Sequence, residues 1–226
     1  MMLFIFIGTL LISLFATWRV RSAYSKYSKV PASSGMTGAD IAQSILDRCG
    51  IRDVTIHSQP GTLTDHYDPS HKRLVLSEAN YSGTSVAALG VSAHECGHAI
   101  QHQQAYAPLQ WRMAAVGITN IASQVVMWLP LLGGLFMGLK PGLMITIMAI
   151  GWGILMLFQL VTLPVEFDAT ARAKRILAET GALAPGAETD GMNRVLNAAA
   201  MTYVAAFITS LAYFLWYLLR MMGDRR

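Results

Sequence analysis

Charged residues are scarce in this chain. They make up 13% of its 226 residues, whereas apolar residues make up 54%, and an ordinary globular protein carries about 25% charged residues. This shortage indicates a membrane protein rather than a soluble one. Cysteine is also rare, since Cys49 and Cys96 are the only two, and the pair neither requires nor excludes an oxidising compartment. No internal repeat or low-complexity tract is evident.

Long apolar runs take up much of the sequence. A helix needs about 20 apolar residues to cross a bilayer, and four stretches meet this requirement: Met2–Trp18, Met113–Leu139, Gly142–Leu163 and Ala198–Leu219. The first has no basic leader and no clear cleavage site, which indicates a retained anchor rather than a cleaved signal peptide. None of them contains a charged residue. A metal transporter, which needs such groups inside its spans, is therefore disfavoured.

Residues 94–98 read His-Glu-Cys-Gly-His. On a helix, the residues at i and i+4 share one face, so His94 and His98 can bind one metal ion. Glu95 lies about 100° further round the helix, close enough to act on a water molecule without being a ligand. Zinc brings the pKa of such a water near neutrality, and a carboxylate can then take its proton. The pattern predicts a zinc hydrolase with Glu95 as its catalytic base.

Catalytic zinc usually takes three protein ligands and leaves one position open. His102 fails on geometry, because on an unbroken helix it lies about 12 Å along the axis from His94. Glu166 is the better candidate, since it follows the third apolar run, and Pro164 suits the start of a new helix there. We expect a carboxylate on this second helix to complete a two-histidine, one-glutamate site. The alternative is an acidic residue at a helix start with no metal to bind.

The sequence around these residues resembles the YugP-like family of bacterial membrane zinc metallopeptidases. The similarity covers nearly the whole chain and is carried by Asp65-His66-Tyr67-Asp68-Pro69, Leu74–Ser77, Ser85–Leu89, Ala93–Gln101 and Leu163–Ala169. It implies a neutral zinc protease related to HtpX-type and CAAX-type membrane proteases. In that wider group an aspartate four residues after the glutamate ligand supports a histidine. Here Thr170 takes that position and Asp168 lies closer to Glu166, so a supporting role for Asp168 is a hypothesis.

The apolar runs divide the chain into membrane helices and two segments outside the membrane. We expect the helices at residues 1–18, 113–139, 142–163 and 198–219, with 19–112 and 164–197 outside. Two spans separate the outside segments, so both face one side of the membrane and the three expected ligands can meet. Basic residues near span ends favour a cytoplasmic location for that side in a bacterial inner membrane, with both termini outside. The side with the expected ligands has Arg19, Arg21, Lys26, Lys29, Arg112, Arg172, Lys174, Arg175 and Arg194. The opposite side has fewer basic residues: Lys140, Arg220, Arg225 and Arg226.

The segment 19–112 predicts a small α+β unit. Thr37–Cys49 has helical periodicity, Val54–His57 and Arg73–Ser77 read as short strands, and the residues 94–98 lie on a helix from about Thr84 to Tyr106. The strand directly before that helix is expected to present its edge to an extended peptide. The expected fold class is mainly α, with about four transmembrane helices and a small zincin-like α+β catalytic unit outside the membrane.

The expected activity is that of a gluzincin-like zinc metalloendopeptidase. Glu95 activates the water, and the Zn²⁺ cofactor is held by His94, His98 and Glu166. Arg172 and Tyr203 are candidates for stabilising the oxyanion that develops on the peptide carbonyl.

The partners follow from the position of this site near the bilayer. We expect membrane or membrane-proximal polypeptides as substrates, which suggests membrane protein quality control. The net charge of +4 comes from residues that flank the membrane spans, so no nucleic-acid partner is expected. The alternative function is a non-catalytic membrane scaffold that retains zinc and leaves no coordination position open. The oligomeric state is not predicted.

Overall fold

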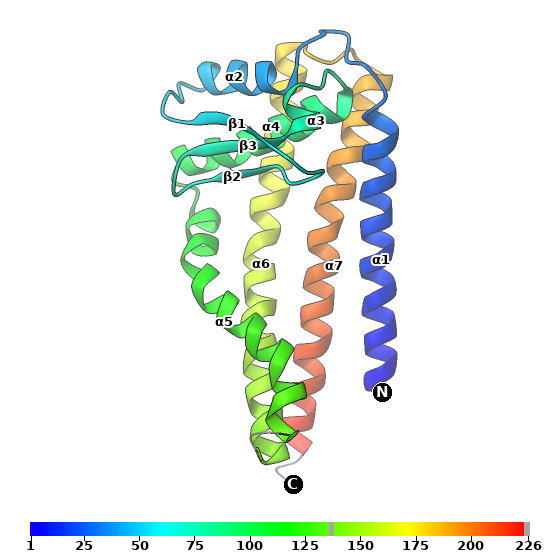
Figure 1. The fold of residues 1–226 in the computed structure, drawn as a ribbon, viewed down its shortest axis with the longest axis vertical. Coiled ribbons are helices and arrows are strands. Elements are labelled where there is room, and N and C mark those ends of the chain that lie inside the picture. Colours follow the sequence, from blue (N-terminus) through cyan, green and yellow to red (C-terminus); the bar gives the residue numbers. More distant parts are fainter. Residues whose placement is uncertain (136–137, 224–226) are drawn as a thin grey trace.

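The computed structural model describes residues 1–135 and 138–223 and is mostly helical (Figure 1). Its elements, in chain order, are α1 Met2–Tyr27, α2 Gly38–Arg48, β1 Thr55–Gln59, β2 His66–Asp68, β3 Arg73–Ser77, α3 Glu78–Tyr81, α4 Val86–Gln103, α5 Ala107–Leu135, α6 Pro141–Thr180 and α7 Ala187–Gly223.

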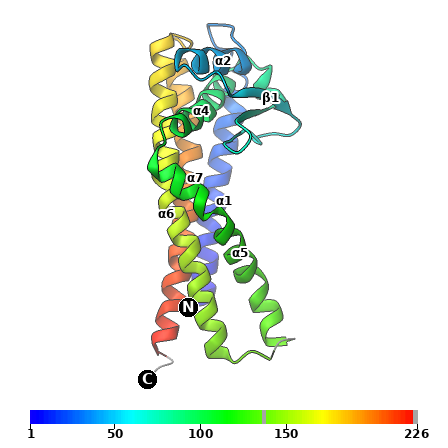
Figure 2. The same cartoon turned by 90° about the vertical axis from the view of Figure 1, so that its left-hand side faces the viewer.

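Helices α1, α5, α6 and α7 are long and apolar enough to cross a membrane. Large apolar side chains on them, such as Phe4, Phe15 and Leu131, are exposed on the outer faces, as expected for helices that contact lipid. Helix α7 packs against α1 and α6, and α5 packs against α6. Both chain ends lie at one end of the bundle and the α+β unit lies at the other (Figures 1 and 2). The structure confirms the predicted fold class.

The α+β unit contains a three-stranded sheet in the order β1-β3-β2. Strand β1 runs parallel to β3, and β2 runs antiparallel to it. We expected a free edge on the strand that precedes the helix with residues 94–98 (the HExxH motif). This expectation is wrong, because that strand is β3, the central strand of the sheet. Strand β2 was not predicted: it has three residues directly before Pro69, too few to show a period of two. It occupies one edge of the sheet.

Helix α4 lies at the centre of this unit, and its start is set by a local hydrogen bond. Ser85 caps the helix by accepting a hydrogen bond from the Ala88 backbone nitrogen, which satisfies one free amide of the first turn. Most of the helix is buried. Its apolar side chains share a core with residues of α2, α6 and α7, including Ile41, Leu177 and Leu196. The helix that carries the HExxH motif is therefore held by membrane helices as well as by its own small domain.

Helix α6 differs from the prediction at Pro164. A new helix was expected to start there, but α6 runs through this proline without a break. The missing amide of an internal proline costs one hydrogen bond, and membrane helices often tolerate this because neighbouring groups satisfy the freed carbonyl. Glu166 consequently lies on the same continuous helix as the third apolar run. Helix α7 likewise begins at Ala187, well before the expected membrane span 198–219.

Candidate metal centre

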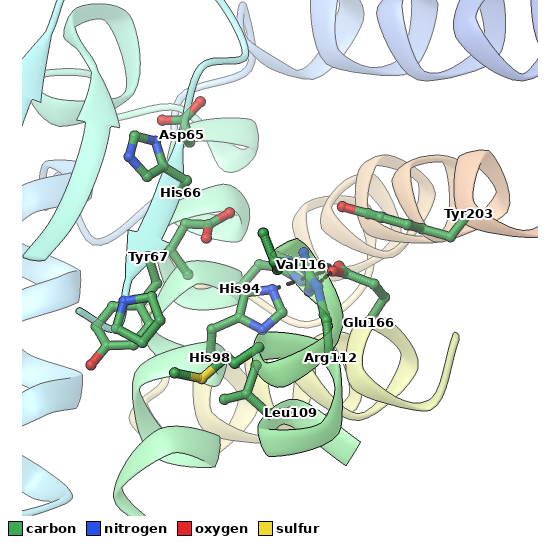
Figure 3. A pocket seen from close by; sticks show the side chains of 13 residues that line it. Asp65, His66, Tyr67, His94, His98, Leu109, Arg112, Val116, Glu166 and Tyr203 are labelled. Atoms are coloured by element: carbon green, nitrogen blue, oxygen red, sulfur yellow. Dashed lines mark hydrogen bonds and ion pairs between the residues drawn. The ribbon is translucent and has the colours of Figure 1, made fainter. Parts of the chain in front are cut away.

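His94, His98 and Glu166 come together where α4 crosses α6 (Figure 3). One ligand atom from each lies within 4.8 Å of the others. Glu166 Oε2 is 3.3 Å from His94 Nε2 and 3.6 Å from His98 Nε2. Both imidazoles therefore point Nε2, a ring nitrogen that can bind a metal ion, toward the same carboxylate oxygen.

The Glu166 carboxylate shows that a cation fits this cluster. Its oxygen Oε2 is buried and, among the residues that the structure describes, no hydrogen-bond partner reaches it. A buried charged oxygen without a partner is costly. A cation between Oε2 and the two imidazole nitrogens would satisfy all three atoms at once. Two histidines and one carboxylate are a donor set that zinc accepts, with a fourth position left open.

A glycine allows α4 and α6 to approach closely enough for this cluster to form. Gly97 lies between the two histidines, and a Cβ atom placed on it would be 2.8 Å from the carbonyl oxygen of Ala169 and 3.0 Å from its Cα. Ala169 is one helical turn after Glu166. The contact therefore sets the distance between the turn that carries the histidines and the turn that carries the carboxylate.

Gln101 connects His98 to α6. Its Nε2 donates to the Val165 carbonyl and to Asp168 Oδ2, both at 2.8 Å, so its Oε1 is left to accept a hydrogen bond from His98 Nδ1 at 3.0 Å. This arrangement places the proton of a neutral His98 on Nδ1 and leaves Nε2 free as a ligand atom. Asp168 therefore acts on His98 only indirectly, through Gln101.

His94 has a different partner. Its Nδ1 lies 3.3 Å from Thr170 Oγ1, so a hydroxyl rather than a carboxylate faces this histidine. Asp168 instead accepts a hydrogen bond from Arg172 Nε at 2.5 Å.

Arg112, at the start of α5, holds the other oxygen of the Glu166 carboxylate. Its Nη1 donates to Glu166 Oε1 at 2.7 Å, which fixes the carboxylate and leaves Oε2 facing the histidines. The sequence offered no signal for this contact, because Arg112 follows the α4 helix and has the appearance of an ordinary basic residue before a membrane span. Gln101 did carry a signal, since it lies one helical turn after His98.

Glu95 is buried beside the cluster and lines a cavity of about 240 Å³ that reaches the two histidines. Burial raises the pKa of its carboxyl above the usual range, although His94 and His98 nearby lower it in part. A higher pKa makes the ionised carboxylate a stronger proton acceptor.

The two oxyanion candidates have different positions. Tyr203 on α7 lines the same cavity, and its side chain points toward it (Figure 3). Arg172 does not line that cavity, and its guanidinium is bound to Asp168 and to Gln104. His102 is hydrogen-bonded to Tyr67 at 2.8 Å and takes no part in the cluster. The cavity wall also includes His66, an exposed residue on β2.

Among the described residues, four apolar helices and a cluster of two histidines and a carboxylate define a membrane protein with a candidate metal centre. A family model described as "putative neutral zinc metallopeptidase" matches residues 2–222. The chain is 45% identical over 231 residues to the "putative membrane protease YugP" of Bacillus subtilis (strain 168), and the match covers 99% of each chain. No solved structure matches.

The chain therefore belongs to this zinc metallopeptidase family, and the predicted resemblance is confirmed. It is a membrane protein, its cofactor is zinc, and polypeptides are its substrates.

Proposed function

We propose that this protein is a zinc metalloendopeptidase of the gluzincin-like type. The observation that carries the proposal is the buried Oε2 of Glu166, which accepts no hydrogen bond from the described residues and faces the Nε2 atoms of His94 and His98 at 3.3 and 3.6 Å. These three residues are the proposed zinc ligands. Arg112 holds Glu166 in place, and Glu95 lies beside the cluster as the proposed catalytic base.

The chemistry divides between the metal and the chain. Bound zinc supplies Lewis acidity, which polarises the peptide carbonyl and lowers the pKa of a water molecule. Glu95 accepts a proton from the attacking water and then donates it to the leaving amine. The raised pKa of this buried carboxyl suits both transfers. Tyr203 is the proposed donor to the oxyanion that develops on the carbonyl, because its side chain lines the cavity at the cluster.

Strand β2 is the proposed binding edge for an extended substrate. It lies at the edge of the sheet, and Asp65, His66 and Tyr67 line the cavity next to the cluster. A peptide that pairs with this edge by main-chain hydrogen bonds would place a peptide bond near Glu95. This replaces the expectation that the strand directly before α4 binds the substrate.

The proposed location is a bacterial inner membrane, with the α+β unit in the cytoplasm. The excess of basic residues on that side supports this orientation. Glu166 follows the expected span 142–163 directly, so the site lies at the membrane surface. We propose that membrane-proximal segments of other proteins are its substrates and that it contributes to membrane protein quality control.

Two variants of the purified protein in detergent test the proposed site. Glu166→Ala is expected to lose the zinc that elemental analysis finds in the wild type, at about one ion per chain. Glu95→Gln is expected to keep its zinc and to cleave a fluorogenic peptide more slowly by about two to four orders of magnitude. Zinc retained in full by Glu166→Ala would place the third ligand elsewhere. Full activity in Glu95→Gln would rule out Glu95 as the catalytic base, and a zinc-loaded wild type that cleaves no peptide would favour the scaffold alternative.

A further inference from the structure

A second cavity adjoins the candidate metal centre, on the flank opposite the first. It has a volume of about 220 Å³ and lies between α1, α4 and α7, with Leu63 of the loop before β2 on its open side. The two cavities share four lining residues at the metal centre: Asp65, His94, Glu95 and Tyr203. They therefore meet where the peptide bond would be cleaved.

Away from the shared residues, the walls of this second cavity are mostly aliphatic. They are formed by Val20, Val91, Val195, Leu196, Ala199 and Ala200, with Leu63 opposite. No lysine or arginine within the described ranges 1–135 and 138–223 lines it. The first cavity, in contrast, contains Arg112 and His66.

Away from the shared residues, both hydroxyl groups in the second cavity are already used by the protein. Tyr24 donates to Asn80 Oδ1 at 2.8 Å, and Thr202 donates to the Ala199 carbonyl at 2.6 Å. A polar side chain that entered this part of the cavity would lose its water and gain no free hydroxyl donor there in return. An apolar side chain would bury its surface against six aliphatic residues.

We infer that the second cavity is the subsite for an aliphatic side chain of the substrate residue next to the scissile bond. This inference rests on the proposed function and adds a substrate class to it. A peptide that spans both cavities has one flank beside Arg112 and the other against α1 and α7. Val20 and Ala199 lie at the ends of the expected membrane spans 1–18 and 198–219. The subsite is therefore at the membrane surface, where the apolar end of a membrane segment emerges.

Ala199 offers a way to fill the subsite. It is half-buried and lines the cavity, so the phenylalanine side chain of Ala199→Phe is expected to occupy the cavity. Met201, two residues along α7, is exposed and does not line the cavity. Met201→Phe is therefore the matched control on the same helix.

The experiment compares fluorescent octapeptides that carry Leu, Gly, Asp or Lys on either side of one peptide bond. Wild-type kcat/KM is expected to be about tenfold or more higher for Leu than for Asp or Lys at one of these two positions. Ala199→Phe is expected to lower kcat/KM for the Leu peptide by about tenfold while changing it little for the Gly peptide. Met201→Phe is expected to match the wild type, and zinc content checks that each variant is folded.

Binding gives a second readout that does not depend on catalysis. In the Glu95→Gln background, fluorescence anisotropy is expected to show tighter binding of the Leu peptide than of the Asp peptide. The additional change Leu63→Asp, on an exposed loop, is expected to remove this difference. Equal binding of both peptides, or equal losses for Leu and Gly peptides in Ala199→Phe, would overturn the subsite while hydrolysis by the wild type continues. If the zinc-loaded wild type cleaves no peptide, the proposed function fails, and the subsite fails with it.

Discussion

At the scale of single residues, the two histidines of the metal centre are held by different chemical groups. Gln101 accepts from His98, whereas Thr170 faces His94. The amide of Gln101 is itself fixed by two acceptors on α6, so it cannot turn over without losing both hydrogen bonds. The orientation of His98 is therefore determined more strictly than that of His94.

Replacing Gln101 should weaken zinc binding without removing a ligand. Gln101→Leu leaves His98 Nδ1 without its acceptor, so the imidazole loses its fixed tautomer and orientation. We expect the dissociation constant for zinc to rise by about 10- to 100-fold, measured by competition with a chromogenic chelator. Gln103→Leu, an exposed change on the same helix, is the control. Equal zinc affinities in the two variants would contradict the role given to Gln101.

The two cysteines should differ in reactivity. Cys96 is fully buried and Cys49 is partly buried, and both are free thiols. Burial raises the pKa of Cys49, so less thiolate is present at neutral pH and alkylation should accelerate as the pH rises toward that pKa. We expect mass spectrometry after iodoacetamide treatment of the folded protein to find the label on Cys49 alone. The variant Cys49→Ser should then stay unlabelled until it is denatured, and labelling of Cys96 in the folded variant would show that α4 is less protected than its burial implies.

Much of the candidate site was predictable at this scale, because ligand spacing on a helix is a local property. The positions of His94, Glu95 and His98 follow from one turn of α4. Arg112 was not predictable, since its contact with Glu166 joins residues that are distant in sequence and depends on how α5 leaves α4.

At the scale of helices and strands, the crossing of α4 and α6 determines whether the site exists. Gly97→Ala would place a methyl group 2.8 Å from the Ala169 carbonyl oxygen, so the two helices must separate. We expect a loss of stability of about 1–3 kcal/mol and a lower zinc content, measured by thermal unfolding in detergent and by elemental analysis. Gly117→Ala, where no atom lies within 4 Å of the added carbon, should retain both. A normal zinc content in Gly97→Ala would mean that the crossing tolerates a wider separation.

Sequence patterns predicted these elements unevenly. Long apolar runs and the period of α2 were clear, because each repeats over several turns. Strand β2 has only three residues and depends on pairing with β3, so no local pattern reveals it. Pro164 misled the prediction because proline more often starts a helix than lies within one, and the packing that stabilises α6 around it involves other helices.

At the scale of the whole molecule, the start of α1, the start of α6 and the last turn of α7 lie opposite the α+β unit (Figure 1). The proposed orientation therefore predicts opposite results for reporters at the two ends of the bundle. A fluorescent protein that matures only in the cytoplasm should be bright when inserted between α6 and α7, near Gly186. It should be dark when fused after Arg226. The reverse pattern would place the α+β unit outside the cell.

The order of elements along the chain has a consequence for biogenesis. Helix α4, with both histidines, is synthesised before α5 and α6, and Glu166 follows only after the chain has crossed the bilayer twice more. The three proposed ligands cannot surround one ion until the α5–α6 hairpin is inserted and folded back on α4. A nascent chain that fails to enter the membrane therefore has an incomplete metal centre. With these proposed ligands, membrane insertion is the step that completes the metal centre, and chains left in the cytosol are expected to stay inactive.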